Sequence, residues 1–163
     1  AEVEQADLSG KAEDVRGRAA ELGIDLAQGC AFVLARATPR KAVSENWRGR
    51  LVLVIERVAR SLNPQVVTAQ VDRPGLQAGE VYVLLPSSEA ATIAKAAQTI
   101  REELEASLDE FNFTVGFGRI TSEPGELYRA GQEALLAVNV QMKDDRENLI
   151  NQSILVKVEQ VTQ

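Results

Sequence analysis

Histidine is absent from this chain of 163 residues, which also contains only one cysteine, Cys30. Without histidine there can be no Ser-His-Asp or Cys-His nucleophile, no His-ligated zinc and no imidazole proton shuttle. One cysteine excludes an internal disulfide and a cysteine-based metal cage. Because Cys30 begins the apolar run CAFVLA, we interpret it as a buried strand residue. Any catalysis would depend on carboxylates, lysine or tyrosine.

Excess positive charge and long apolar runs are also missing. The chain has 24 acidic and 18 basic residues, a net charge of −6, so it lacks the positive surface that phosphate backbones require. No run approaches the roughly 18–20 apolar residues of a membrane span, and the N-terminal segment is too polar for a secretory signal. We therefore expect a cytoplasmic protein that binds neither nucleic acid by itself nor membranes.

The chain has the composition of an ordinary globular domain. Hydrophobic residues make up 45% and charged residues 26% of it, whereas aromatic residues reach only 4%. A chain of this length can bury a sizeable core without disulfides or a metal, and this core must consist mainly of Val, Leu, Ile and Ala. One domain is therefore expected.

The spacing of apolar residues predicts nine elements in the order α-β-α-β-β-α-β-α-β. Their approximate ranges are helix 8–22, strand 30–37, helix 44–62, strands 65–71 and 80–86, helix 88–104, strand 111–118, helix 122–142 and, after a polar loop at 143–152, strand 154–158. This order predicts an α/β (α+β) fold, with one mixed sheet and helices packed against it. We expect residues 1–23 to form an N-terminal connector helix and residues 24–163 a single globular unit.

Three segments carry a resemblance to a known family. They are AAELGIDLAQGCAFVLA (19–35), EVYVLLPSSEAATIAKAAQTIREELE (80–105) and FTVGFGRITSEPGELYRAGQEALLAV (113–138). In order and spacing they resemble the GGDEF fold of diguanylate cyclases, and more closely the degenerate GGDEF-like domain of PucR/CdaR-type bacterial transcriptional regulators. The resemblance implies a ferredoxin-like, GGDEF-like arrangement of the sheet and its helices.

The residues at the cyclase motif do not support the cyclase reaction. The alignment places the motif on Gln77, Ala78, Gly79, Glu80 and Val81, so one acidic residue remains and the two leading glycines are lost. The first strand, FVLARA, lacks the metal-binding aspartate that the cyclases have there, and Thr68 and Val71 stand where their product-inhibition motif would fall. Phosphoryl transfer needs carboxylates that hold Mg²⁺. We therefore expect no catalytic residues, no metal, no cofactor and no enzyme activity.

Four residues are weak candidates for ligand binding: Arg36, Asp72, Arg73 and Glu80. Each also has an ordinary structural interpretation, which we favour. Glu80 stands where a strand begins, Asp72 and Arg73 lie in a hairpin turn, and Arg36 is better explained by a surface ion pair. Gly116 and Gly118 do not form a phosphate loop, and we expect them to allow close packing or a bulge.

The resemblance leads to a functional hypothesis. The chain would be a non-catalytic regulatory and dimerisation domain that couples an upstream sensor to a helix-turn-helix domain, with a second copy and the other domains of the parent regulator as partners. Another interpretation is a sensor module that binds a nucleotide or small metabolite in the degenerate groove. A residual Mg²⁺-dependent cyclase is the third. The effector, the regulated genes and the interface cannot be read from the sequence.

Overall fold

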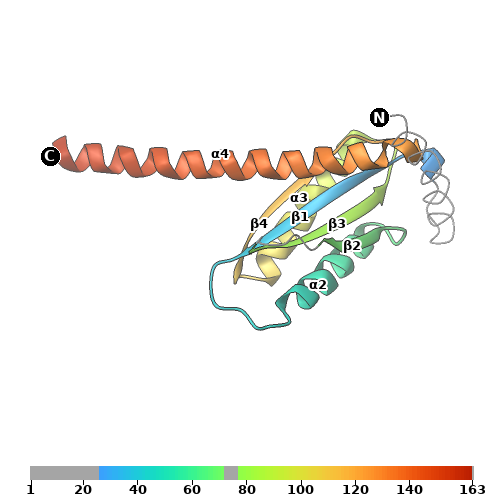
Figure 1. Cartoon of the computed structure of the whole chain (residues 1–163), viewed down its shortest axis with the longest axis horizontal. Helices are drawn as coiled ribbons and strands as arrows, with labels where there is room; N and C mark the ends of the chain where they lie inside the picture. The colour runs from blue at the N-terminus through green and yellow to red at the C-terminus, as the bar shows by residue number, and fades with distance from the viewer. Residues whose placement is uncertain (1–25, 72–76, 163) are drawn as a thin grey trace, which may run out of the picture.

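The computed structural model describes residues 26–71 and 77–162, with side chains up to residue 148. The connector helix expected at 8–22 lies outside the described residues. Within the described residues, four strands and three long helices follow one another (Figure 1). The elements are the 3-10 turn η1 (Leu26–Gln28), β1 (Cys30–Pro39), α2 (Trp47–Leu62), β2 (Val67–Val71), β3 (Gly79–Pro86), α3 (Ala90–Ser107), β4 (Phe111–Phe117), the 3-10 turn η2 (Pro124–Glu126) and α4 (Leu127–Thr162).

The strands form a four-stranded sheet in the order β2-β3-β1-β4. This order, reached through β-α-β-β-α-β, is the ferredoxin-like arrangement, and it confirms the predicted α+β fold. All strand pairs among the described residues are antiparallel, so the sheet is not mixed as expected. The predicted parallel component was wrong because the hairpin reverses the chain direction between the two helical crossovers.

The two faces of the sheet bury different sets of residues because successive side chains of a strand point to opposite sides. On β1, Ala31, Val33, Ala35 and Ala37 belong to the main core, which includes residues from α2 and α3. The alternate residues face α4, where Leu34 packs with Ala134 and Val138. Figure 1 shows α4 running along one side of the sheet, opposite α2.

The predicted loop at 143–152 and the predicted strand at 154–158 are both wrong. Helix α4 continues without interruption to Thr162, and its 36 residues span about 54 Å at 1.5 Å per residue. The alternation of Ile154, Val156 and Val158 suggested a strand, but the sequence after Gly131 contains neither glycine nor proline. A helix already fixed by packing therefore propagates through this segment, since adding a residue costs less than starting a new element.

Candidate functional site

The degenerate motif lies at the start of β3 and is closed off by α2. Ala78, Gly79 and Val81 are buried, and only Gln77 is exposed. A Cβ atom on Gly79 would come within 2.7 Å of Leu51 Cδ2 and 2.9 Å of Trp47 Cζ3. Glycine is needed here because the side chains of α2 lie directly on the strand. Apolar packing therefore occupies one side of the motif position.

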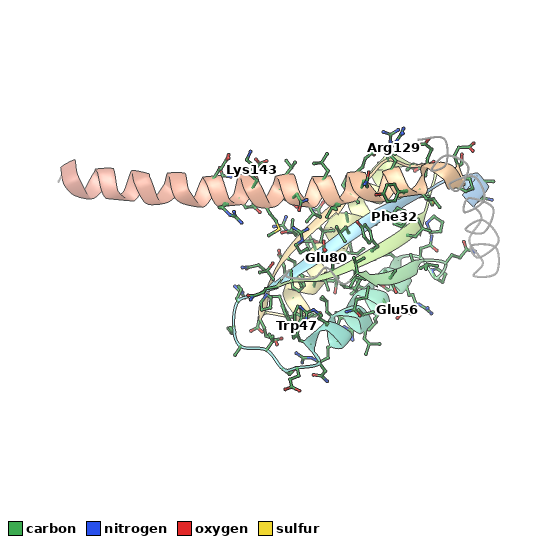
Figure 2. The ribbon with its side chains drawn as sticks, in the orientation of Figure 1. Phe32, Trp47, Glu56, Glu80, Arg129 and Lys143 are labelled. Atoms are coloured by element: carbon green, nitrogen blue, oxygen red, sulfur yellow. The ribbon has the colours of Figure 1, made fainter. Side chains whose placement is uncertain are left out.

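Glu80 points to the other side of the sheet, where it forms an ion pair with Arg36. In Figure 2 Glu80 is labelled over the strands, between α4 on one side and Trp47 on the other. The Oε2 atom of Glu80 accepts hydrogen bonds from Arg36 Nη2 at 3.0 Å and from Nε at 3.3 Å. The two residues are direct partners in the β1–β3 register, and their side chains are 9% and 1% exposed. The ion pair expected for Arg36 is present, but it is buried and not on the surface as expected.

Two residues of α4 complete the surroundings of the guanidinium. Arg36 Nη1 donates to Asn139 Oδ1 at 2.9 Å and lies 3.0 Å from Met142 Sδ. Within the described part of the chain, no buried side-chain nitrogen or oxygen lacks a hydrogen-bond partner. The cluster of Arg36, Glu80, Asn139 and Met142, called the Arg36 cluster below, thus joins β1, β3 and α4.

Sequence reasoning singled out Arg36 and Glu80 separately but missed their contact, and it missed Asn139 and Met142 altogether. A signal was present, since Asn139 and Met142 are three residues apart and so share one side of a helix. Arg36 also shares the strand parity of Phe32 and Leu34, which face α4. Asp72 and Arg73 lie outside the described residues, so nothing is known here of their place.

The cluster can hold charge but offers little to a metal ion. Its one carboxylate already accepts two hydrogen bonds from a cation. Among the described residues there is no group of three or more histidine, cysteine, aspartate or glutamate residues that could hold a metal. The arrangement is suited to holding α4 against the sheet.

Gly116 and Gly118 allow α4 to lie directly on β4. A Cβ atom on Gly116 would meet the backbone nitrogen of Val138 at 2.9 Å, and one on Gly118 would collide with the carbonyl oxygen of Ala130. The expectation of close packing is therefore confirmed for both glycines. Beside them, Arg119 donates to Glu133 Oε1 from Nε at 2.6 Å, and this hydrogen bond lowers the pKa of the Glu133 carboxyl.

A cavity of about 680 Å³ opens at the end of the sheet where β1 finishes and β4 begins, and Met142 of the Arg36 cluster lines part of it. Charges of both signs line it, from α3, α4 and the residue that follows β1. They include Arg40, Arg101, Glu105, Asp145 and Arg146. Its charged lining suits a polar small molecule, and sequence reasoning did not identify it.

The structure is an α+β domain with a ferredoxin-like strand order, and core residues occupy the position that the resemblance assigns to the motif. The family model of the GGDEF-like domain matches residues 8–140. The chain belongs to the GGDEF-like domain family.

Other comparisons add little. No curated protein matches the chain significantly. Among solved structures, the chain is similar to the de novo designed protein Foldit4, with a TM-score of 0.42 and 16% identity over 56% of this chain and 97% of that one. It is also similar to the VAO-type flavoprotein MtVAO713 from Myceliophthora thermophila C1, with a TM-score of 0.41 and 15% identity over 69% of this chain and 21% of that one. At these values neither similarity assigns a function.

No helix of the described residues is long and apolar enough to span a bilayer.

Proposed function

We propose that this chain is a non-catalytic regulatory domain of a cytoplasmic bacterial transcriptional regulator of the PucR/CdaR type. It pairs with a second copy and couples a sensor region to a helix-turn-helix domain of the same regulator. One observation carries this proposal: Glu80, the only acidic residue at the motif position, is 1% exposed and bound to Arg36. A carboxylate in this position is unavailable to hold Mg²⁺ between phosphate groups.

The Arg36 cluster supports the coupling role. It joins two strands to a helix that continues far beyond the sheet, so a change in strand position would reach α4 through charged contacts. Buried ion pairs contribute little net stability, but in some proteins they fix one arrangement of elements against others. The proposed mechanism is a shift between two packings of α4, driven by a signal received upstream.

The absence of catalysis is tested by incubating the chain with GTP or ATP and with Mg²⁺ or Mn²⁺. We expect no cyclic product and no pyrophosphate above a reaction without protein. The matched variant is Glu80→Gln, which keeps the size of the side chain and removes the charge. A cyclic product that forms with the unmodified chain and is lost in this variant would refute the non-catalytic role.

The association with a regulator is tested on the parent gene. We expect the gene to encode a helix-turn-helix domain in addition to this one. A gene that encodes no DNA-binding domain would contradict the proposed transcriptional role while leaving the dimerisation role open to its own test.

The cavity at the end of β1 favours a second candidate function, the binding of an anionic or zwitterionic metabolite or nucleotide. Its lining provides cations and carboxylates at one place, and such groups can form charge-assisted hydrogen bonds with a charged ligand. A thermal-shift screen with GTP, cyclic di-GMP, purines and organic acids tests it. Binding would be supported if a ligand stabilises the chain, if Arg146→Ala removes this stabilisation, and if Arg60→Ala, on the exposed side of α2, retains it. The absence of any shift in melting temperature at millimolar ligand would exclude binding.

A further inference from the structure

A row of exposed residues follows α4 on the side away from the sheet. Leu136 is 62% exposed and Val140 is 49% exposed, although Ala134 and Val138, each two residues before one of them, are completely buried. Two residues along a helix correspond to a turn of about 200°, so the exposed pair lies roughly opposite the packed pair. These two apolar side chains lie one turn apart and form a small exposed patch that a partner helix can cover.

The row continues at the spacing of a coiled coil. Lys143 and Glu147 are exposed and follow Val140 at intervals of three and four residues. In the sequence, Ile150, Ile154 and Lys157 extend the same alternation, and the backbone of α4 is helical through all of them. Intervals of three and four residues keep one stripe facing a partner helix. We call the positions 133, 136, 140, 143, 147, 150, 154 and 157 the α4 seam.

Much of this seam lies on a part of α4 that has no sheet beneath it. Figure 1 shows the second half of α4 leaving the sheet, and Lys143 is labelled near this point in Figure 2. The remainder, residues 147–162, is called the arm. The arm propagates from the packed half of α4, and packing of the seam against a second helix would stabilise it further.

We propose that the α4 seam pairs in antiparallel orientation with the α4 seam of a second copy of this chain. The inference rests on the proposed dimerisation and specifies its surface. An antiparallel pair centred at position 145 aligns Leu136 with position 154 and Val140 with position 150, which are both isoleucine. The two-fold axis repeats each pair, so the interface is closed and self-complementary.

The charges of the seam select this orientation. In the antiparallel register Lys143 faces Glu147 of the second copy. Glu133, which is paired with Arg119 of its own chain, lies at the end of the seam opposite position 157, a lysine. In a parallel register, each of these four charged residues would instead face the same residue of the second copy, which carries the same charge. Opposite charges inside a helix pair fix register and direction, whereas like charges oppose association.

The position of the seam also leaves room for the second copy. The seam lies opposite the packed face of α4, and its residues Leu136 and Val140 border a shallow hollow beside Phe117 of β4. A helix packed on the seam would therefore lie along α4 and next to the β4 edge of the sheet. The two-fold axis places the two sheets on opposite sides of the helix pair and near its opposite ends. The arm of each copy then covers Leu136 and Val140 of the other.

Disulfide trapping tests the orientation. A chain with Leu136→Cys and a tagged chain with Ile154→Cys are mixed and oxidised mildly, and the products are separated by size. We expect mainly the mixed disulfide, because these positions face each other only in the antiparallel pair. The unmodified chain is the control; its only cysteine, Cys30, is buried and should give no cross-link. A majority of Leu136→Cys homodimers would overturn the proposal.

Charge exchange tests the selectivity. Lys143→Glu places two carboxylates together in both symmetry-related layers. We expect the dissociation constant of the dimer, measured by sedimentation equilibrium, to rise by about tenfold or more. The double variant Lys143→Glu/Glu147→Lys should recover the original constant. Asp145→Lys makes an opposite change of charge off the seam and should leave it nearly unchanged. Recovery that fails in the double variant would contradict the paired register.

The outcomes separate this inference from the proposed function. A chain that is dimeric but gives no mixed disulfide retains the proposed dimerisation and loses the α4 seam as its surface. A chain that stays monomeric at all concentrations overturns both, while the nucleotide assay still decides the non-catalytic role by itself.

Discussion

The two faces of the sheet are packed by different means. Helices α2 and α3 cover one face with an apolar core, whereas α4 covers the other with apolar residues around the buried Arg36 cluster. An apolar core contributes most of the folding free energy and specifies orientation weakly. A buried ion pair contributes little net stability but is costly to leave half-formed. The difference indicates that one face holds the domain together and the other fixes where α4 lies.

The largest expected effect comes from breaking the ion pair on one side. Glu80→Ala leaves the Arg36 guanidinium charged and buried, and it should lower the free energy of unfolding by about 3–5 kcal/mol in urea denaturation. As a control, Glu56→Ala removes an exposed ion pair with Arg60 on α2 and should cost less than about 1 kcal/mol. Replacing both partners, with Arg36→Met and Glu80→Leu, should restore most of the loss. A cost for Glu80→Ala that equals the control would show that the cluster does not fix α4.

The apolar face should respond to the loss of volume. Ile100 on α3 is 1% exposed, and Ile100→Ala should lower the free energy of unfolding by about 2–5 kcal/mol because it leaves a cavity. This cost should add to that of a change on the α4 face, since the two clusters share no partners. Strong non-additivity between Ile100→Ala and Glu80→Ala would show that the faces are coupled.

The close approach of α4 to β4 is tested at a glycine. Gly116→Ala should destabilise by about 1–3 kcal/mol, because the added Cβ meets the backbone of Val138 and α4 must move outward. Gly49→Ala in α2 is the matched control. Nothing lies within 4 Å of its added Cβ, so it should stabilise the protein by about 0.5–1 kcal/mol. Similar effects at both glycines would contradict the direct contact between α4 and β4.

The smallest expected effect on stability at neutral pH comes from the thiol of Cys30, which lies beneath the start of α4. Cys30 packs with Leu127, and burial raises the pKa of its thiol to about 11 from an ordinary 9.0. At pH 8 the native thiol should react with a disulfide reagent about 100-fold more slowly than in the urea-unfolded chain, from the thiolate fraction alone.

The same shift gives a pH dependence with a definite sign. The folded state holds the thiol proton more tightly, so this contribution to stability is complete below pH 9 and is lost as the pH rises through 11. Glu80→Ala should accelerate labelling of Cys30 if the cluster holds α4 down, whereas Ile100→Ala should change it only through global stability. Equal acceleration in both variants would remove the distinction between the faces.

The sequence alone was sufficient to predict the helices and strands that bury one clear apolar stripe. The strands at 30–37 and 80–86 and the helices around Ile55 and Ile100 follow from runs and spacings that permit one interpretation. The prediction of a strand at 154–158 was wrong because two patterns overlap there. Ile154, Val156 and Val158 satisfy a strand pattern, while Ile150, Ile154 and Val161 satisfy a helical one. Only the packing of the preceding helix decides between these patterns.

The site was harder to predict than the fold. The loss of the motif acids was visible in the sequence, but the partner of Glu80 depends on the register between β1 and β3, which local patterns do not determine. The role of Asn139 and Met142 depends on which turn of α4 lies over Arg36. That position is set by Gly116 and Gly118, whose missing side chains carry no periodic signal.

Because α4 is one uninterrupted helix, it acts as a stiff lever with its pivot on the sheet. The arm of 16 residues is about 24 Å long, so a tilt of about 10° at the Arg36 cluster would carry its tip sideways by about 4 Å. A tilt too small to disturb the core therefore moves the tip by about the distance between contacting atoms of two packed helices. A change in the contacts of Arg36 with Asn139 and Met142 would therefore have its largest effect at the far end of α4.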